Sequence, residues 1–416
     1  MKDYRLVKTA CYATNVTMSI VTNLSPLLFL TFHRMYGVSY TLLGMLVLIN
    51  FVTQLGIDLV FSFFAHRFNI PLTVKLTPWI GACGLIQFAL APFIFPGAVY
   101  LGLVVGTVVF SAACGLAEVL MSPVIAAIPS ENPDREMSKL HSIYAWGVVG
   151  MILVATVLLL LVGDDGWMVL PLVFSLVPLL AGVLFLKSEI PPMETPEKAS
   201  GALQMFRQPG LWLSVLAIFF GGASECTMAQ WSSGYLEQAL GIPKVWGDIF
   251  GVALFGLMLA LGRTMYAKWG KHMERILVAG FAASIGCYLI CALTSLPLVG
   301  LLSCAFTGFC ASMLWPGNLV IAADRFPKGG VFIYAIMAAG GDLGASVGPQ
   351  LVGIVTDVLS VDPQMIAMAE GFGLSPDQFG LKCGLLIAAV FPLCGLMIAI
   401  RFLKSLKKTK SADNCA

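Results

Sequence analysis

Long apolar runs recur along the whole chain, and they limit the folds that it can adopt. A helix of about 20 residues crosses a 30 Å hydrocarbon core, because each residue adds 1.5 Å. Hydrophobic residues make up 58% of the 416 residues and charged residues only 11%, against about 25% in soluble domains. The sequence therefore predicts an all-α membrane protein with twelve transmembrane helices, at 11–32, 40–64, 73–95, 99–128, 140–161, 167–186, 211–236, 245–267, 276–293, 298–323, 331–359 and 379–403.

The basic residues support this number of crossings. If the N-terminus is cytoplasmic, all but three of the 24 Lys and Arg residues fall on the cytoplasmic side, the exceptions being Arg34, Lys244 and Lys382. The first apolar run has no small-residue cleavage site, so it is interpreted as a spanning helix and not as a signal peptide. We expect a multi-pass protein of the cell membrane, in a bacterium the inner membrane, with both termini in the cytoplasm.

A charged, proline-rich segment divides the twelve helices into two sets of six. We predict an N-terminal six-helix bundle at 1–186, a cytoplasmic linker at 187–208 and a C-terminal six-helix bundle with a basic tail at 209–416. The two halves show weak sequence similarity, since Gly56 and Gly262 each lie ten residues before a histidine. Residues 360–382 predict a short surface helix, followed by a capping box that starts at Ser375 and begins the last span.

Motifs of other membrane machines are missing from the sequence. There is no phosphate-binding G-x-x-x-x-G-K-[ST] loop, no H-E-x-x-H and no G-x-S-x-G, which argues against an ATP-driven pump and against an enzyme. The eleven cysteines form no C-x-x-C pair and are interpreted as small core residues. We expect no cofactor, no bound metal and no nucleic-acid partner, and a monomer in contact with the lipid bilayer.

Three acids within the predicted spans carry the most chemical information, namely Glu118, Glu225 and Asp342. Placing a charged carboxylate at this depth costs free energy. The low dielectric constant favours its protonated form unless an opposite charge, a cation or water reaches it. No Lys or Arg is expected at matching depth. We therefore predict that these acids couple proton uptake to a change of access; the alternative is that each stays protonated and hydrogen-bonds a neighbouring helix.

Other polar residues in the spans are candidates for contact with a substrate. Amide and hydroxyl groups beside an aromatic ring suit a sugar, which has apolar faces and a polar rim. For any single residue, a hydrogen bond between helices is the alternative role. The candidates are Asn23, Asn50, Gln54, Gln87, Thr227, Gln230, Trp231, Trp315 and Asn318.

Four charged residues near the cytoplasmic ends of their spans form a separate group. We hypothesise that Asp58, Arg263, Asp324 and Arg325 belong to a network that closes the cytoplasmic side, with Arg263 and Asp324 as a pair. The alternative is that these side chains extend to the lipid headgroups.

Residues 115–123, GLAEVLMSP, resemble the G-x-x-E-x-x-x-x-P signature of the fucose-permease-like sugar/cation symporters. The Gly262–Arg263 pair, the sequence DRFP at 324–327 and the glycine-rich 344–353 are also similar to features of the major facilitator superfamily. The resemblance implies two pseudo-symmetric six-helix bundles, and for Glu118 a role in substrate binding and proton coupling.

Two departures from the family pattern concern the substrate. The loop at 62–71 has His66 where the superfamily usually has an acid, and 23–26 lacks the acid of fucose permease. We predict a secondary transporter that takes up a sugar or similar small polar solute by alternating access, with H⁺ preferred over Na⁺ as the coupling ion. The alternatives are a proton-driven exporter of drugs or metabolites and a membrane sensor without transport activity.

Overall fold

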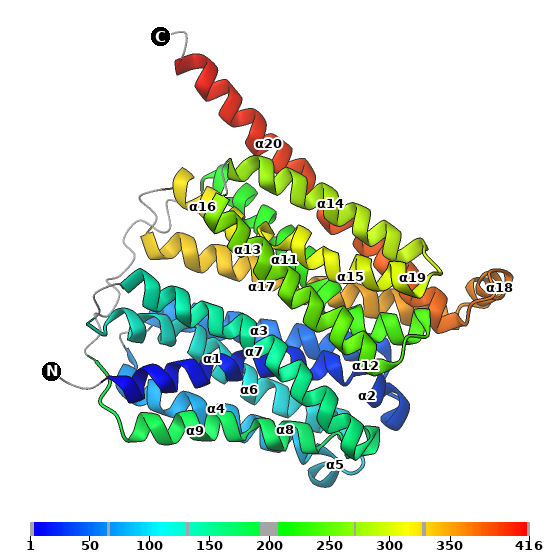
Figure 1. Ribbon diagram of the computed structural model, residues 1–416, viewed down its shortest axis with the longest axis horizontal. Coiled ribbons are helices and arrows are strands. Elements are labelled where there is room, and N and C mark those ends of the chain that lie inside the picture. The colour runs from blue at the N-terminus through cyan, green and yellow to red at the C-terminus, as the bar shows by residue number, and fades with distance from the viewer. Residues whose placement is uncertain are drawn as a thin grey trace. The chain divides into compact units, whose positions relative to one another are not determined.

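The computed structural model describes residues 4–64, 67–129, 133–191, 207–269, 272–326 and 330–413. These residues are helical with short connections, and none of them lies in a β-strand. The chain divides into two compact units, Met1–Lys198 and Ala199–Ala416, whose long helices run side by side within each unit (Figure 1). The predicted all-α fold is confirmed. The linker assigned to 187–208 stays a prediction, since 192–206 lie outside the described residues.

The first unit contains six long helical stretches, three of them interrupted. Its elements are α1 (Arg5–Leu27), α2 (Phe29–Tyr36), α3 (Tyr40–Phe64), α4 (Ile70–Ala89), α5 (Ala91–Ile94), α6 (Val99–Ala126), α7 (Pro133–Val162), η2 (Asp164–Gly166), α8 (Val169–Phe174) and α9 (Leu176–Leu186).

The second unit repeats this organisation, again with three of its long stretches interrupted. Its elements are α11 (Pro209–Leu240), α12 (Lys244–Trp246), the π-helical η3 (Gly247–Ala253), α13 (Leu254–Trp269), α14 (Met273–Leu293), α15 (Pro297–Ala311), α16 (Leu314–Arg325), α17 (Gly330–Val361), α18 (Pro363–Gly371), α19 (Pro376–Ala388) and α20 (Val390–Asp413). The predicted surface helix is α18, and the predicted capping box of Ser375 and Gln378 begins α19.

Nine helical stretches among the described residues are long and apolar enough to cross a membrane, or ten if α1 and α2, bent by 44°, form one span. Of the other predicted spans, 73–95 corresponds to α4 with α5, and 140–161 to α7, whose apolar part is Trp146–Val162. Of the 18 consecutive residues of Lys244–Tyr266 that are most apolar, only 33% are buried inside the chain. Such exposed apolar surface fits lipid contact, while the full count of twelve spans stays a prediction.

Glycine contacts bring α11 and α17 together in the second unit. A Cβ at Gly222 would lie 2.5 Å from the carbonyl oxygen of Gly341, and a Cβ at Gly344 would meet the Phe219 carbonyl group. Lipid gives apolar side chains little reason to associate, so membrane helices rely on such close backbone packing. The close contacts at Gly341 and Gly344 flank Asp342 on α17.

The three basic residues that the predicted topology places on the outer side all have partners. Arg34 pairs with Asp164 at 3.4 Å and Lys244 with Asp248 at 3.3 Å. Lys382 is buried and donates hydrogen bonds to the carbonyls of Ala292 and Thr294, at the end of α14. A helix end leaves carbonyls without partners, so Lys382 serves there as a cap.

Replacing Gly344 with Ala tests the glycine contact. We expect Gly344→Ala to lower the free energy of unfolding by about 1–3 kcal/mol, because the new methyl group has no space. Gly286→Ala is the matched control: Gly286 lies on α14 with no neighbour within 4 Å of an added Cβ, so Ala should be neutral or stabilising by up to about 1 kcal/mol. Thermal unfolding in detergent measures both, and equal midpoints for the two variants would contradict the packing argument.

Replacing Lys382 with Met tests the cap. Two carbonyls at the end of α14 would lose their donor, and we expect a loss of about 1–3 kcal/mol in the free energy of unfolding. Arg34→Ala removes an ion pair whose side chains are both more than 40% exposed, and should cost about 1 kcal/mol or less. A Lys382→Met variant no less stable than Arg34→Ala would contradict the role of Lys382.

Candidate functional site

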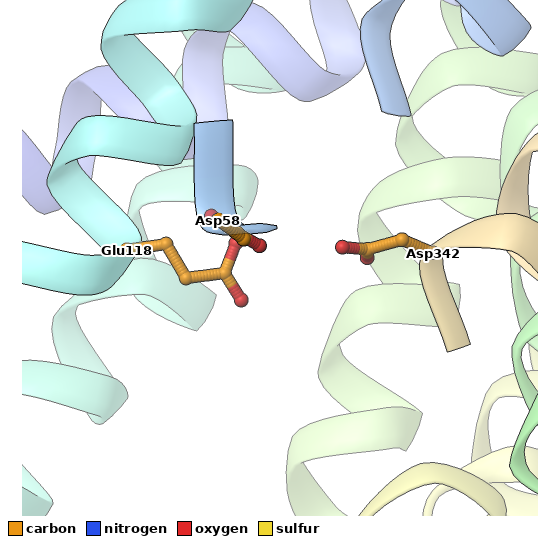
Figure 2. A group of neighbouring side chains, drawn as sticks. All are labelled: Asp58, Glu118 and Asp342. Carbon is orange, nitrogen blue, oxygen red and sulfur yellow. The ribbon is translucent and has the colours of Figure 1, made fainter. Parts of the chain in front are cut away.

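Asp58 and Glu118 form a pair of carboxyl groups in the first unit (Figure 2). Asp58 lies on α3 and Glu118 on α6, and oxygen atoms of the two side chains lie within 4.8 Å of each other. Asp58 is only 9% exposed, and its Oδ1 has no hydrogen-bond partner in the described part of the chain. Asp342, also labelled in Figure 2, belongs to α17 of the second unit.

Gly115 explains why α3 and α6 come close enough for this pair to form. A Cβ at Gly115 would lie 3.0 Å from Ile57 Cβ and 3.1 Å from the carbonyl oxygen of Gln54. Gly115 precedes Glu118 by about one turn, and Gln54 precedes Asp58 by about one turn. One close contact between backbones therefore brings the two acids to the same level, which gives the glycine of the G-x-x-E motif a physical role.

An amide–hydroxyl network lies beside the pair on the same two helices. Ser111 Oγ donates to Asn50 Oδ1 at 2.5 Å, and Gln54 Nε2 donates to the same oxygen at 3.1 Å. All three side chains are buried. The predicted substrate residue Asn50 thus joins α3 to α6, and the predicted substrate residue Gln54 donates to Asn50 within α3. The sequence analysis missed Ser111, a small hydroxyl residue that nothing in the sequence distinguishes from other serines in the spans.

The described basic side chains form no ion pair with Asp58 or Glu118. The Glu118 residue is exposed, whereas Asp58 is buried. Such a pair can hold a proton or attract a small cation. Within each unit taken alone, the described residues include no three His, Cys, Asp or Glu side chains whose ligand atoms are close enough to share a metal ion.

Glu225 on α11 has a basic partner, so the expectation that no Lys or Arg lies at its depth is wrong. Arg263 Nη2 on α13 lies 3.3 Å from Glu225 Oε1. The same guanidinium donates from Nε to the carbonyl of Ser312, at 3.1 Å. Arg263 therefore joins α11 and α13 to the break between α15 and α16.

The sequence explains why the Ser312 carbonyl has no donor within its own helix and is available to Arg263. In a helix this oxygen would accept a hydrogen bond from the N–H of residue 316, and that residue is Pro316, which has none. Gly262 lets α13 approach, because a Cβ there would meet the Ser312 side chain. Proline at this position was a usable sign that a side chain from elsewhere must satisfy Ser312.

Trp231 has a packing role in this structure. Its ring is fully buried, and its indole N–H donates to the carbonyl of Pro349 on α17 at 2.9 Å. Its neighbours Thr227 and Gln230 are also buried, and Gln230 Oε1 has no hydrogen-bond partner among the described residues. Of these three predicted substrate residues, Thr227 and Gln230 both combine burial with a polar atom that the described residues leave available.

The other predicted substrate residues mostly bond to helix backbone. Asn23 donates to Ser19 within α1, Gln87 on α4 donates to Gly102 on α6, and Asn318 donates to Ala217 on α11. Trp315 is half-buried, and its ring packs against Gly341. The alternative role, hydrogen bonding between helices, therefore describes Gln87 and Asn318.

Part of the predicted cytoplasmic network is described. Arg325 lies over the ring of Phe402, 4.0 Å from its centroid. The side chain of Asp324 lies outside the described residues, so its pairing with Arg263 stays a prediction. Arg263 contacts Glu225, and Asp58 lies beside Glu118, so both are placed next to the acids of their own units.

A double-mutant cycle on Arg263 and Glu225 measures their interaction. We expect a coupling free energy of about 1 kcal/mol, because Glu225 is shielded while Arg263 is partly exposed. The control cycle on Arg34 and Asp164, a pair of similar length but greater exposure, should give a smaller value. Additive effects of Arg263→Gln and Glu225→Gln on thermal unfolding would contradict the pairing.

Solved structures with the same fold are membrane transporters. The D-xylose–proton symporter gives a TM-score of 0.72 at 15% identity, covering 93% of this chain and 96% of that one. A bacterial homolog of the human lysosomal transporter Spinster gives 0.70 at 15%, covering 97% of each chain. A single-residue variant of the E. coli fucose:proton symporter FucP gives 0.60 at 14%, covering 96% and 99%. These identities establish the fold alone.

No curated protein sequence matches the chain. The family model described as Major Facilitator Superfamily matches residues 10–349, which is most of the chain. The predicted resemblance to this superfamily is confirmed, and its members are transporters and not enzymes. The chain belongs to the Major Facilitator Superfamily and is a multi-pass membrane transporter.

Proposed function

We propose that this transporter couples the movement of H⁺ to the uptake of a small polar solute, with a sugar as the first candidate. The observation that carries the proposal is the Asp58–Glu118 pair, two carboxyl groups within 4.8 Å on apolar helices without a described basic partner. Alternating access of two six-helix bundles would expose this pair to each side in turn.

Electrostatics favours a shared proton at this pair. Two negative charges at about 5 Å repel by about 3 kcal/mol at an effective dielectric constant of 20. Holding one proton removes this repulsion. A pair of like acids therefore binds a proton more readily than either acid alone. We accordingly propose Asp58 as a partner in proton binding, in place of a separate role in the cytoplasmic network.

Glu225 has a different role in this proposal. With Arg263 beside it, its negative charge is balanced without a proton. The proton site would then lie in the first unit, while the Glu225–Arg263 pair of the second unit would organise α11 and α13 near Gln230. The assignment of proton coupling to Asp342 stays a prediction.

Two similar structures support the choice of proton and of sugar. The D-xylose–proton symporter and the fucose:proton symporter both share this fold. The buried amide oxygen of Gln230 has no hydrogen-bond partner among the described residues, and it can accept a hydrogen bond from a hydroxyl, as a sugar requires.

Transport by purified protein in liposomes tests the proposal. With a panel of radiolabelled monosaccharides and an imposed pH gradient, Asp58→Asn and Glu118→Gln should each reduce gradient-driven accumulation by at least about tenfold. Exchange without a gradient should persist in part, because it needs no net proton movement. Glu370→Gln, on the exposed surface of α18, is the control. Full concentrative uptake in both acid variants would contradict the proton site, and outward transport under the same gradient would contradict uptake.

A further inference from the structure

Helices α14 and α15 face each other with two pairs of cysteines. Cys291 Sγ lies 3.4 Å from Cys304 Sγ, and Cys287 Sγ lies 3.9 Å from Cys310 Sγ. All four thiols are free and buried. The Cys291–Cys304 pair is the nearer to the connection at 294–296, which joins the two helices. Neither the proposed transport cycle nor the family match gives these thiols a role.

The surroundings of the two pairs differ. Lys382 donates to the carbonyls of Ala292 and Thr294, one and three residues after Cys291. Tyr235 donates its hydroxyl to the carbonyl of Cys291. A cation beside a thiol favours the thiolate, which is the nucleophile in thiol chemistry. Near the second pair, Arg263 donates to the carbonyl of Ser312, two residues after Cys310, and the two sulfurs lie 0.5 Å farther apart than those of Cys291 and Cys304.

We propose that Cys291 and Cys304 form a dithiol modification site, at which a small neutral peroxide converts the two thiols into a disulfide between α14 and α15. Cys291 is the attacking thiol and Cys304 the resolving thiol. Lys382 is a positioning residue that directs the first attack to Cys291.

The reaction balances with one peroxide. The Cys291 thiolate attacks one oxygen of hydrogen peroxide, so that an S–O bond forms, the O–O bond breaks and the departing hydroxide takes a proton to become water. The Cys304 sulfur then attacks the resulting sulfenic acid, an S–S bond forms, the S–O bond breaks and a second water leaves. Two thiols and one hydrogen peroxide give one disulfide and two waters.

Burial decides which oxidants reach the pair. Cys291 and Cys304 have no exposed surface, and the neighbouring Ile290 and Leu293 present apolar side chains on the outside of the unit. A charged or bulky disulfide is excluded by such surroundings, while a small uncharged peroxide is admitted. The two sulfurs need to approach from 3.4 Å to about 2.05 Å, which rotation of the two side chains can provide.

The unmodified full-length protein in liposomes provides the main test. It is treated with hydrogen peroxide or with oxidised glutathione, its remaining thiols are blocked, and non-reduced peptides are identified by mass spectrometry. We expect a Cys291–Cys304 link with peroxide and none with oxidised glutathione, at about tenfold higher yield than a Cys287–Cys310 link. Exposed Cys83 serves as the control for peroxide reaching the protein, through its trapping by dimedone. Oxidised Cys83 without a Cys291–Cys304 link would overturn the proposal, as would equal yields for the two pairs.

Single variants test the order of attack. After brief treatment with peroxide and unfolding in dimedone, Cys304→Ser should carry at least about five times more label at Cys291 than Cys291→Ser carries at Cys304. In Cys304→Ser/Lys382→Gln this advantage should disappear, while Cys83 reacts as before. Equal trapping at Cys291 with and without Lys382 would remove Lys382 from the mechanism.

Discussion

Close contact between helix backbones at glycine is the interaction on which the rest of this structure depends. In the first unit Gly115 brings α6 against α3, and in the second Gly222 and Gly344 bring α11 against α17. Apolar side chains surrounded by lipid gain little from facing each other, so close backbone packing and hydrogen bonds must hold the helices. The position of the first unit's acids depends on such a contact, because Asp58 and Glu118 meet one turn beyond the Gly115 contact.

The two units stabilise their acids in different ways. In the first, two carboxyl groups face each other without a described cation, which leaves a proton as the simplest means of relieving their repulsion. In the second, Arg263 supplies the opposite charge to Glu225. A carboxylate balanced by a guanidinium has less need of a proton than a carboxyl beside another carboxyl. The proposed division between a proton site and a charge-balanced site rests on this contrast.

Sequence reasoning reached the all-α membrane fold, the family and the capping box at Ser375, because hydropathy and local hydrogen bonding act over short stretches of chain. It recognised Glu118 through its motif and noticed Asp58. It missed their pairing and that of Glu225 with Arg263, because a contact between residues 38 or 60 positions apart depends on how helices pack. It assigned Trp231 to the substrate, while the ring lies inside the α11–α17 contact. Side-chain direction on a helix without a clear polar face could not be inferred from spacing alone.

Pro316 and Arg263 together connect the break between α15 and α16 to Glu225 on α11. Pro316 removes the donor that would satisfy the Ser312 carbonyl, and Arg263 replaces that donor while it holds Glu225. One planar guanidinium thus has two acceptors on different elements, the turn between α15 and α16 and the side chain on α11. Because the guanidinium is rigid, a change of bend at Ser312 alters the geometry available to Glu225. The charge balance of the acid in the second unit is therefore tied to the shape of α15 and α16, whereas Asp58 and Glu118 depend only on the spacing of α3 and α6.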